Sequence, residues 1–204
     1  MSFGAHQVTT TEADKISRFN VEVTSVGGRF LRVPDLSTVG DYVTELALAS
    51  KAKQIILCSD ALSSSLFLSY PTSQPFKAVV KGELSDEQFF ETLKTAEIGV
   101  SAVDLAVAET GTLILATEDE SDRLVTALTQ AHVAIVPRSR LVLSLEEAES
   151  HISKMLADAK EGICISLVSA SSRTSDIGDM NILGVHGPKE LHVLLLEQEF
   201  LKSA

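Results

Sequence analysis

The chain has 204 residues, of which 45% are hydrophobic and 22% charged, a composition typical of one folded domain rather than a disordered segment. Its formal net charge of −11 comes from 28 acidic against 17 basic residues, and the basic residues are scattered, which argues against nucleic acid as a partner. Its apolar runs are far shorter than the roughly 20 residues of a membrane helix, and no secretory signal is visible, so we expect a soluble, cytoplasmic protein.

After a polar N-terminal segment (1–11) that we expect to be flexible, apolar runs of strand length alternate with segments of helical periodicity. We expect strands at 29–33, 54–58, 76–80, 98–101, 112–116, 133–136, 163–169 and 191–197. We expect helices at about 36–51, 60–68, 86–95, 121–130 and 144–160. Ser85 and Gln88 have the spacing of a capping box at the start of one of these helices.

This alternation predicts βαβ units that build an α/β three-layer sandwich around an open, mostly parallel sheet. No repeat, low-complexity tract or linker interrupts it, so we expect a single domain over 1–204. The two cysteines, Cys58 and Cys164, both lie in apolar runs and are interpreted as buried side chains. Two thiols cannot supply the four ligands that an iron–sulfur cluster normally takes, so any such cluster must belong to another chain.

Three polar stretches interrupt the hydrophobic pattern. In 108–112 (AETGT), the glycine permits a sharp turn or the close approach of a ligand, and the alternative is a turn whose hydroxyl groups satisfy local amides. In 169–179 (SASSRTSDIGD), which follows an expected strand, hydroxyl groups and Arg173 could hold a carboxylate or phosphate, and the alternative is a helix cap with a solvated arginine.

The third stretch, 184–188 (GVHGP), presents His186 between glycine and proline, where it could transfer protons or serve as a structural hydrogen-bonding residue. His192 lies among apolar residues of a strand and is interpreted as core or edge packing. The chain has no G-x-G-x-x-G after a strand, no P-loop lysine motif, no H-E-x-x-H and no G-x-S-x-G. Motifs therefore do not support nicotinamide, ATP or zinc.

Taken in this order, the three stretches resemble the LUD-domain family, the lactate-utilization protein C type. The matching segments are 103–113 (VDLAVAETGTL), 172–177 (SRTSDI) and 183–193 (LGVHGPKELHV), and the resemblance runs from about Arg29 to Glu197. It implies a fold like that of the sugar-phosphate isomerase, CoA-transferase and formyltetrahydrofolate cyclo-ligase group. It also implies a role in oxidising L-lactate to pyruvate with two partner proteins, at least one of which carries iron–sulfur clusters.

Two departures from the family pattern affect the ligand. The segment 118–122 (EDESD) stands where the family has a glycine-rich stretch, and an acidic loop disfavours an anionic ligand nearby. Arg123 keeps its place and could offset part of that charge. Ala170–Ser171 replace the usual Gly-Pro before the second motif.

The expected site has two candidate catalytic residues, Glu109 and His186, and no metal. The candidate substrate-binding residues are Thr110, Gly111, Thr112, Arg123, Ser172, Arg173, Thr174, Asp176 and Gly187. Three functions stay open at this point. The first is a non-redox subunit of a lactate-oxidising iron–sulfur complex that binds a small carboxylate and has no cofactor of its own. The second is an independent enzyme of the same fold group acting on a small anionic substrate, and the third is a regulatory or scaffolding module.

Overall fold

The computed structural model describes residues 11–69, 75–159, 162–171, 173–174, 182–183 and 187–198, and it is built around a six-stranded sheet. The strand order is β1-β12-β7-β4-β2-β3, and every pairing in this sheet is parallel. The strands are β1 (Arg29–Val33), β2 (Gln54–Leu57), β3 (Lys77–Val80), β4 (Ile98–Ala102), β7 (Ala131–Pro137) and β12 (Glu190–Leu196). They coincide with predicted apolar runs, because a parallel strand covered on both faces needs no polar alternation.

Helices cover both faces of this sheet, which confirms the predicted three-layer α/β sandwich. On one face, α2 (Leu36–Ser50) and α3 (Ala61–Ser69) bury Val43 and Leu66 against the strands. On the other face, α1 (Glu12–Ser25), α4 (Asp86–Leu93) and α5 (Glu120–Leu128) bury Phe19, Phe89 and Val125. None of the described helices combines the length and hydrophobicity that crossing a bilayer requires.

Local sequence signals account for several helix starts. Asp35 caps α2 by accepting a hydrogen bond from the backbone amide of Thr38 at 2.8 Å. The predicted capping box is confirmed, since Ser85 and Gln88 bond reciprocally to each other's backbone amides at the start of α4. Such caps satisfy amide groups that the first helical turn leaves unpaired.

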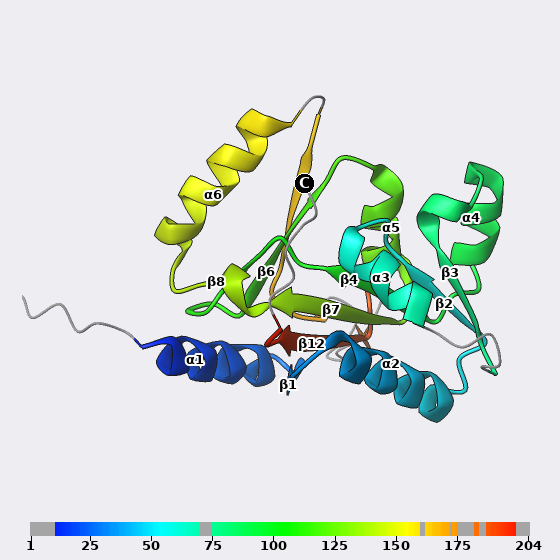
Figure 1. Cartoon of the computed structure of the whole chain (residues 1–204), viewed down its shortest axis with the longest axis horizontal. Helices are drawn as coiled ribbons and strands as arrows, with labels where there is room; N and C mark the ends of the chain where they lie inside the picture. Colours follow the sequence, from blue (N-terminus) through cyan, green and yellow to red (C-terminus); the bar gives the residue numbers. More distant parts are fainter. Residues whose placement is uncertain are drawn as a thin grey trace, which may run out of the picture.

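A second, smaller sheet lies outside the parallel one and was not predicted. Its strands, in spatial order, are β8 (Leu141–Val142), β5 (Leu105–Val107), β6 (Thr112–Thr117) and β9 (Cys164–Val168). The predicted strand at 163–169 is confirmed as β9, but it pairs antiparallel with β6, so the polar loop after residue 169 does not follow a strand of the parallel sheet. Figure 1 shows α6 (Leu145–Asp158) beside this small sheet, at the opposite end of the molecule from α4.

Helix α1 was also missed. Thr11, the last residue of the segment expected to be flexible, is its N-cap and forms a capping box with Asp14. The apolar face of α1 consists of Ile16, Phe19 and Val23, all buried. The rest of the predicted flexible segment lies outside the described residues.

Candidate functional site

The first predicted motif forms the hairpin between β5 and β6, and its glycine contacts a helix. Gly111 has a φ of +65°, a conformation that favours glycine. A Cβ atom built there would lie 2.9 Å from the backbone nitrogen of Val23 and 3.0 Å from the carbonyl carbon of Glu22, both in α1. The close approach that the sequence suggested for a ligand is therefore made by helix α1.

Glu109, in the same hairpin, is anchored to the start of α6. Its Oε1 accepts a hydrogen bond from the backbone amide of Leu145 at 2.9 Å, and its own amide donates to the carbonyl of Leu143 at 3.0 Å. A carboxylate at a helix N-terminus is favoured by the helix dipole. No hydrogen bond to its second oxygen is found within the described part of the chain.

Three hydroxyl groups form a chain that joins the first motif to the segment leading into the second. The Oγ1 of Thr110 donates to the Oγ1 of Thr112 at 2.8 Å, and the latter lies 2.8 Å from the Oγ of Ser169. Ser169 directly follows β9, whose Val168 pairs with Leu113 of β6. The hydroxyl groups of this turn thus bond to one another rather than to local amides.

The second and third motifs are joined by a short antiparallel ribbon. In it β10 (Arg173–Thr174) pairs with β11 (Ile182–Leu183), with Arg173 opposite Leu183. The side chains of Arg173 and Thr174, and the whole of Ser172, Asp176 and His186, lie outside the described residues.

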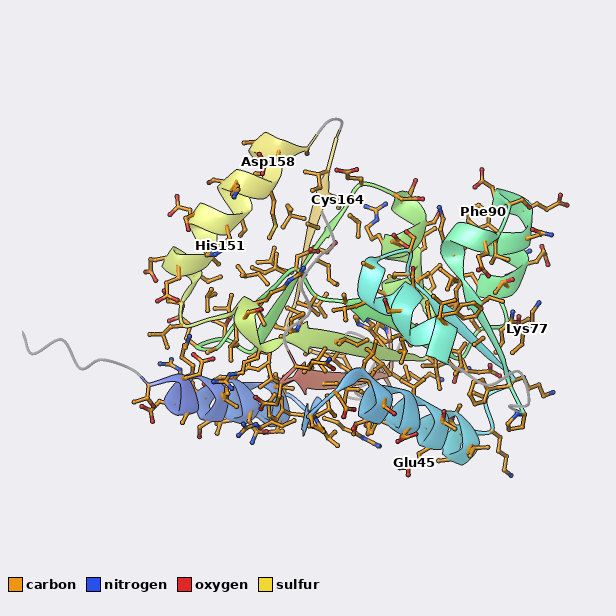
Figure 2. All side chains as sticks on the ribbon, viewed as in Figure 1. Glu45, Lys77, Phe90, His151, Asp158 and Cys164 are labelled. Carbon is orange, nitrogen blue, oxygen red and sulfur yellow. The ribbon has the colours of Figure 1, made fainter. Side chains whose placement is uncertain are left out.

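Two further predicted residues are described. Gly187 lies just before β12, near the amino edge of the parallel sheet, where the amide of Lys189 donates to the carbonyl of Gln130 at 2.7 Å. Arg123, on α5, bonds to Glu120 at 2.8 Å and approaches the sulfur of Cys164 at 3.6 Å. Figure 2 shows Cys164 on β9, and this contact with Arg123 brings the strand beside α5.

A cavity of about 360 Å³ opens at the carboxyl edge of the parallel sheet. It lies between β2 and β4, whose connections run to opposite sides: β2 leads to β3, whereas β4 leads to β7. Open α/β sheets generally bind their ligands at such a switch point. The polar groups of its wall belong to Ser59, Asp60, Ser101, Asp104, Thr117, Glu118, Asp119, Asp122, Thr126 and Arg140.

Two aspartates of this wall hold neighbouring loops together. Asp60 accepts hydrogen bonds from the amide and hydroxyl of Ser63, at 2.8 and 2.7 Å, and from the amide of Ala102 at 3.1 Å. Asp122 accepts from the amide and hydroxyl of Ser59, at 3.0 and 2.6 Å. The loops after β2 and β4 and the first turn of α5 are therefore fixed to one another before any ligand arrives.

The other two aspartates are paired with basic residues. Asp104 accepts from the amide of Ala116 at 2.9 Å and contacts Arg140 at 3.4 Å. Asp119 forms an ion pair with Lys81, and this hydrogen bond lowers the pKa of the Asp119 carboxyl and raises that of the Lys81 ammonium group.

Buried groups form the floor of the cavity. Ser101 is buried, and its Oγ lies 2.9 Å from the Nε2 of the fully buried His132. Desolvation, helped by the nearby His192, lowers the pKa of His132 to about 4, so this ring is neutral at neutral pH. Burial, reinforced by the charges of Asp122 and Asp60, raises the pKa of the Cys58 thiol well above its ordinary value, so Cys58 remains protonated.

None of the sequence-predicted site residues is among the described residues that line this cavity. Thr112 and Thr117 are the two ends of β6, so the hydroxyl chain and the cavity rim are separated by about 17 Å along that strand. The described part of the chain contains no group of three or more His, Cys, Asp or Glu side chains arranged to hold a metal ion.

The family model for the LUD domain matches residues 16–196, which is most of the chain. The chain belongs to the LUD-domain family. The resemblance predicted from the three motifs is thereby confirmed.

Curated relatives of this LUD domain include proteins of lactate utilization. Lactate utilization protein C of Shouchella clausii (strain KSM-K16) is 29% identical over 53% of this chain and 48% of that protein. Lactate utilization protein C of Geobacillus thermodenitrificans (strain NG80-2) is 25% identical over 89% of this chain and 68% of that protein. Lactate utilization protein B of Shouchella clausii is 29% identical over 54% of this chain but only 22% of that protein. The match thus spans about half the length of the Shouchella protein C.

Among solved structures, a DUF162 family protein from Deinococcus radiodurans superposes on this LUD domain with a TM-score of 0.66. The two are 18% identical, and the match covers 92% of this chain and 99% of that one. This likeness supports the fold described above.

Sequence reasoning missed the polar lining of the cavity in this LUD domain. Asp60 and Asp119 stand directly before helical segments, a position typical of helix caps, and they do cap α3 and α5. Their sequence positions are therefore explained without a ligand site. A usable signal was the position of Ser59 and Asp60 directly after β2, because loops at the carboxyl ends of parallel strands commonly bind ligands.

Proposed function

We propose that this LUD domain acts in L-lactate utilization as a subunit that binds a small carboxylate, while iron–sulfur clusters in partner proteins accept the electrons. The names of its protein C and protein B relatives support this role. The whole chain contains two cysteines, half the number of thiolates that a cluster usually takes. One of them, Cys58, is buried with its sulfur 3.5 Å from the carbonyl oxygen of Asp122. These residues do not fit a cluster within this chain.

The observation that carries the carboxylate site is the linkage of the three motifs. The Thr112–Ser169 bond joins the first motif to the strand before the second, and the pairing of Arg173 with Leu183 joins the second to the third. Gly111 also packs on the end of α1, which leads directly into β1, and β1 pairs with β12 just after Gly187. These links support a common site at the amino edge of the sheet, away from the acidic cavity.

In the proposed site, Arg173 holds the substrate carboxylate through a forked pair of hydrogen bonds, with hydroxyl donors from Thr112, Ser172 and Thr174. Thr110, which donates its own hydroxyl proton to Thr112, lines the site and orients that hydroxyl group. Oxidation of lactate to pyruvate removes two electrons and two protons. One of these protons leaves the hydroxyl-bearing carbon and the other leaves the hydroxyl group. Glu109, anchored through one oxygen, or His186 takes the proton of the carbon, the other of these two residues takes the hydroxyl proton, and the two electrons pass to the iron–sulfur clusters of the partner. Asp176 and Gly187 border the same site. Arg123, which bonds to Glu120 at 2.8 Å, offsets charge of the acidic loop at the other edge of the sheet and is not part of the proposed site.

The first test uses the purified chain alone. Calorimetry should detect weak binding of lactate or pyruvate, and an assay with an artificial electron acceptor should detect no lactate oxidation. Oxidation should appear when the chain is combined with cluster-carrying partners. Robust oxidation by the chain alone would refute the subunit proposal. Stabilisation by a phosphorylated sugar, a CoA thioester or a folate, but not by lactate, would favour an independent enzyme instead.

Two serines on or next to β9 provide a matched pair of variants. Ser169→Ala removes the end of the hydroxyl chain and should weaken lactate binding several-fold, since a lost hydrogen bond costs roughly 1 kcal/mol. Ser166→Ala makes the same chemical change three residues away, within β9, and should leave binding unchanged. Equal affinities for both variants would remove the hydroxyl chain from the proposed site.

A further inference from the structure

Strand β9 is an end strand of the small sheet, and its outer edge is open. The strand order β8-β5-β6-β9 gives it a single neighbour, β6. In an antiparallel pair, alternate residues direct their amide and carbonyl groups away from the partner strand. No backbone hydrogen bond joins residues 164–168 to any described residue outside β6. Figure 1 shows β9, in orange, rising like α6 away from the parallel sheet.

The other end strands of the two larger sheets carry features that discourage pairing with a further strand. β1 has Arg29 and Arg32, β3 begins with Lys77, and β8 is only two residues long. Charged side chains on an end strand and very short end strands are both common protections of this kind. By contrast, the stretch 162–170 (GICISLVSA), which contains β9, has no charged residue and no proline. Among the described end strands of these two sheets, β9 alone lacks such protection.

One face of β9 also leaves apolar surface uncovered. Leu167 lies opposite Ile114 of β6, which packs in a cluster with residues of α6, so Ile165 and Leu167 point to the side of the sheet that α6 covers. Ile165 is partly buried in that cluster, but Leu167 is 57% exposed. Helix α6 therefore stops short of the outer edge of the small sheet. An exposed leucine beside open backbone groups is typical of a surface to which another strand can be added.

The residues of β9 are nearly symmetric about Ser166, so the strand is complementary to itself. When a second copy pairs antiparallel with Ser166 on the two-fold axis, Ile165 lies opposite Leu167 and Cys164 lies opposite Val168. Residues opposite each other in such a pair point to the same side, so Leu167 of each copy packs against Ile165 of the other. No charged residue within 162–170 faces its like, so the net charge of −11 on each chain opposes the pairing only over longer distances, where salt screens it.

We propose that β9 is a dimerisation strand, through which two copies of this LUD domain join their small sheets into one continuous antiparallel sheet. A second copy is favoured over a different chain because β9 matches its own sequence in the order of its residues and in its lack of charge. The two-fold axis uses the same strand of both copies, so the contact closes at a dimer. The paired segment is short, and small interfaces are typical of weak, concentration-dependent association.

Sedimentation equilibrium of the purified chain tests the dimer. The average mass should rise from 21.9 kDa toward twice that value as the protein concentration increases from about 1 µM to 1 mM. Raising NaCl from about 0.05 to 0.5 M should move this rise to lower protein concentrations, because salt screens the repulsion between two acidic chains and no ion pair crosses β9. A mass of 21.9 kDa at every concentration, or a dimer that salt weakens, would overturn the proposal.

Leu167→Lys is the principal variant, because the side chain is exposed in the single chain and a lysine on an end strand discourages pairing. It should weaken dimerisation about tenfold or more, since the two equivalent contacts between Leu167 and Ile165 are lost together. Leu48→Lys is the matched control: Leu48 is 54% exposed and lies on α2, on the other face of the parallel sheet, so dimerisation should not change. Equal dimerisation of the two variants would refute pairing through β9.

Ser166→Cys combined with Cys164→Ser tests the same pairing without a charge. Residues opposite each other in antiparallel strands are close enough for a disulfide, so mild oxidation should link the two introduced thiols into a covalent dimer. The unaltered chain, in which Cys164 faces Val168 of the second copy, should form none. Covalent dimer in the unaltered chain but not in the variant would contradict the two-fold pairing about Ser166.

Lactate binding separates this proposal from the proposed function. A chain that dimerises through β9 but does not bind lactate would contradict the proposed function alone. A chain that binds lactate but stays monomeric would contradict the dimer alone.

Discussion

Gly111→Ala tests the conclusion that the glycine of the first motif serves the packing of α1. Two costs add at this position. Alanine is strained at a φ of +65°, which costs about 1–2 kcal/mol. Its Cβ would also lie 2.9–3.0 Å from backbone atoms of Glu22 and Val23, which cannot rotate away, and overpacking of this kind costs about 1–3 kcal/mol. Alanine also restricts the unfolded chain more than glycine does, which offsets about 0.4–1 kcal/mol of these two costs.

The expected net loss in the free energy of unfolding is therefore about 1–5 kcal/mol, measured by urea denaturation followed by circular dichroism. Gly162→Ala is the control, because a Cβ there meets nothing within 4 Å, and it should change stability by less than about 0.5 kcal/mol. Gly111→Asn should recover part of the conformational cost but not the steric one. A Gly111→Ala variant as stable as the parent protein would refute the packing argument and return the glycine to a role in ligand approach.

Three further predictions concern single residues. Glu109→Ala should lower the free energy of unfolding, measured by urea denaturation, by about 1 kcal/mol because the amide of Leu145 loses its acceptor. Glu109→Gln keeps that acceptor and should lower it little. Equal losses in the two variants would contradict the anchoring role of Glu109. His132 should take up a proton near pH 6.5 in the unfolded state but only near pH 4 in the folded state. The free energy of unfolding should therefore fall by up to about 3 kcal/mol as the pH drops from 6.5 to 4. An NMR titration of the folded protein in which the His132 ring has a midpoint near pH 6.5 would contradict this. In the folded protein a maleimide should label Cys164 well before Cys58, whose thiol is buried with a raised pKa, and equal labelling rates in the two single-cysteine variants would argue against that burial.

The parallel sheet and most helices could be predicted because their signals are local. Continuous apolar runs such as Gln54–Leu57 mark strands buried on both faces, and Ser85 with Gln88 marks a helix start. The small sheet could not be predicted in this way. Its strands β5 and β8 span three and two residues, too short for a periodic pattern, and the antiparallel direction of β9 is set by its distant partner β6.

The candidate site likewise has features that local sequence signals predicted and features that depend on distant parts of the chain. Residues 109–112 were singled out correctly as a polar turn, but only the structure shows that Gly111 faces a helix and that Glu109 is bound to α6. The cavity was missed because each of its aspartates has an ordinary local role as a helix cap or a loop contact. Their convergence depends on the order of strands in the sheet, which no local pattern encodes.

That strand order has a consequence for how the chain is made. The last strand, β12, is inserted between β1, the first strand, and β7, so β1 has no neighbour until residues 190–196 have been synthesised. A nascent chain that does not yet include β12 therefore exposes the apolar edge of β7 and leaves β1 unpaired, a state prone to aggregation. The parallel sheet stays incomplete until β12 has been synthesised, and the arrival of this single seven-residue segment closes it.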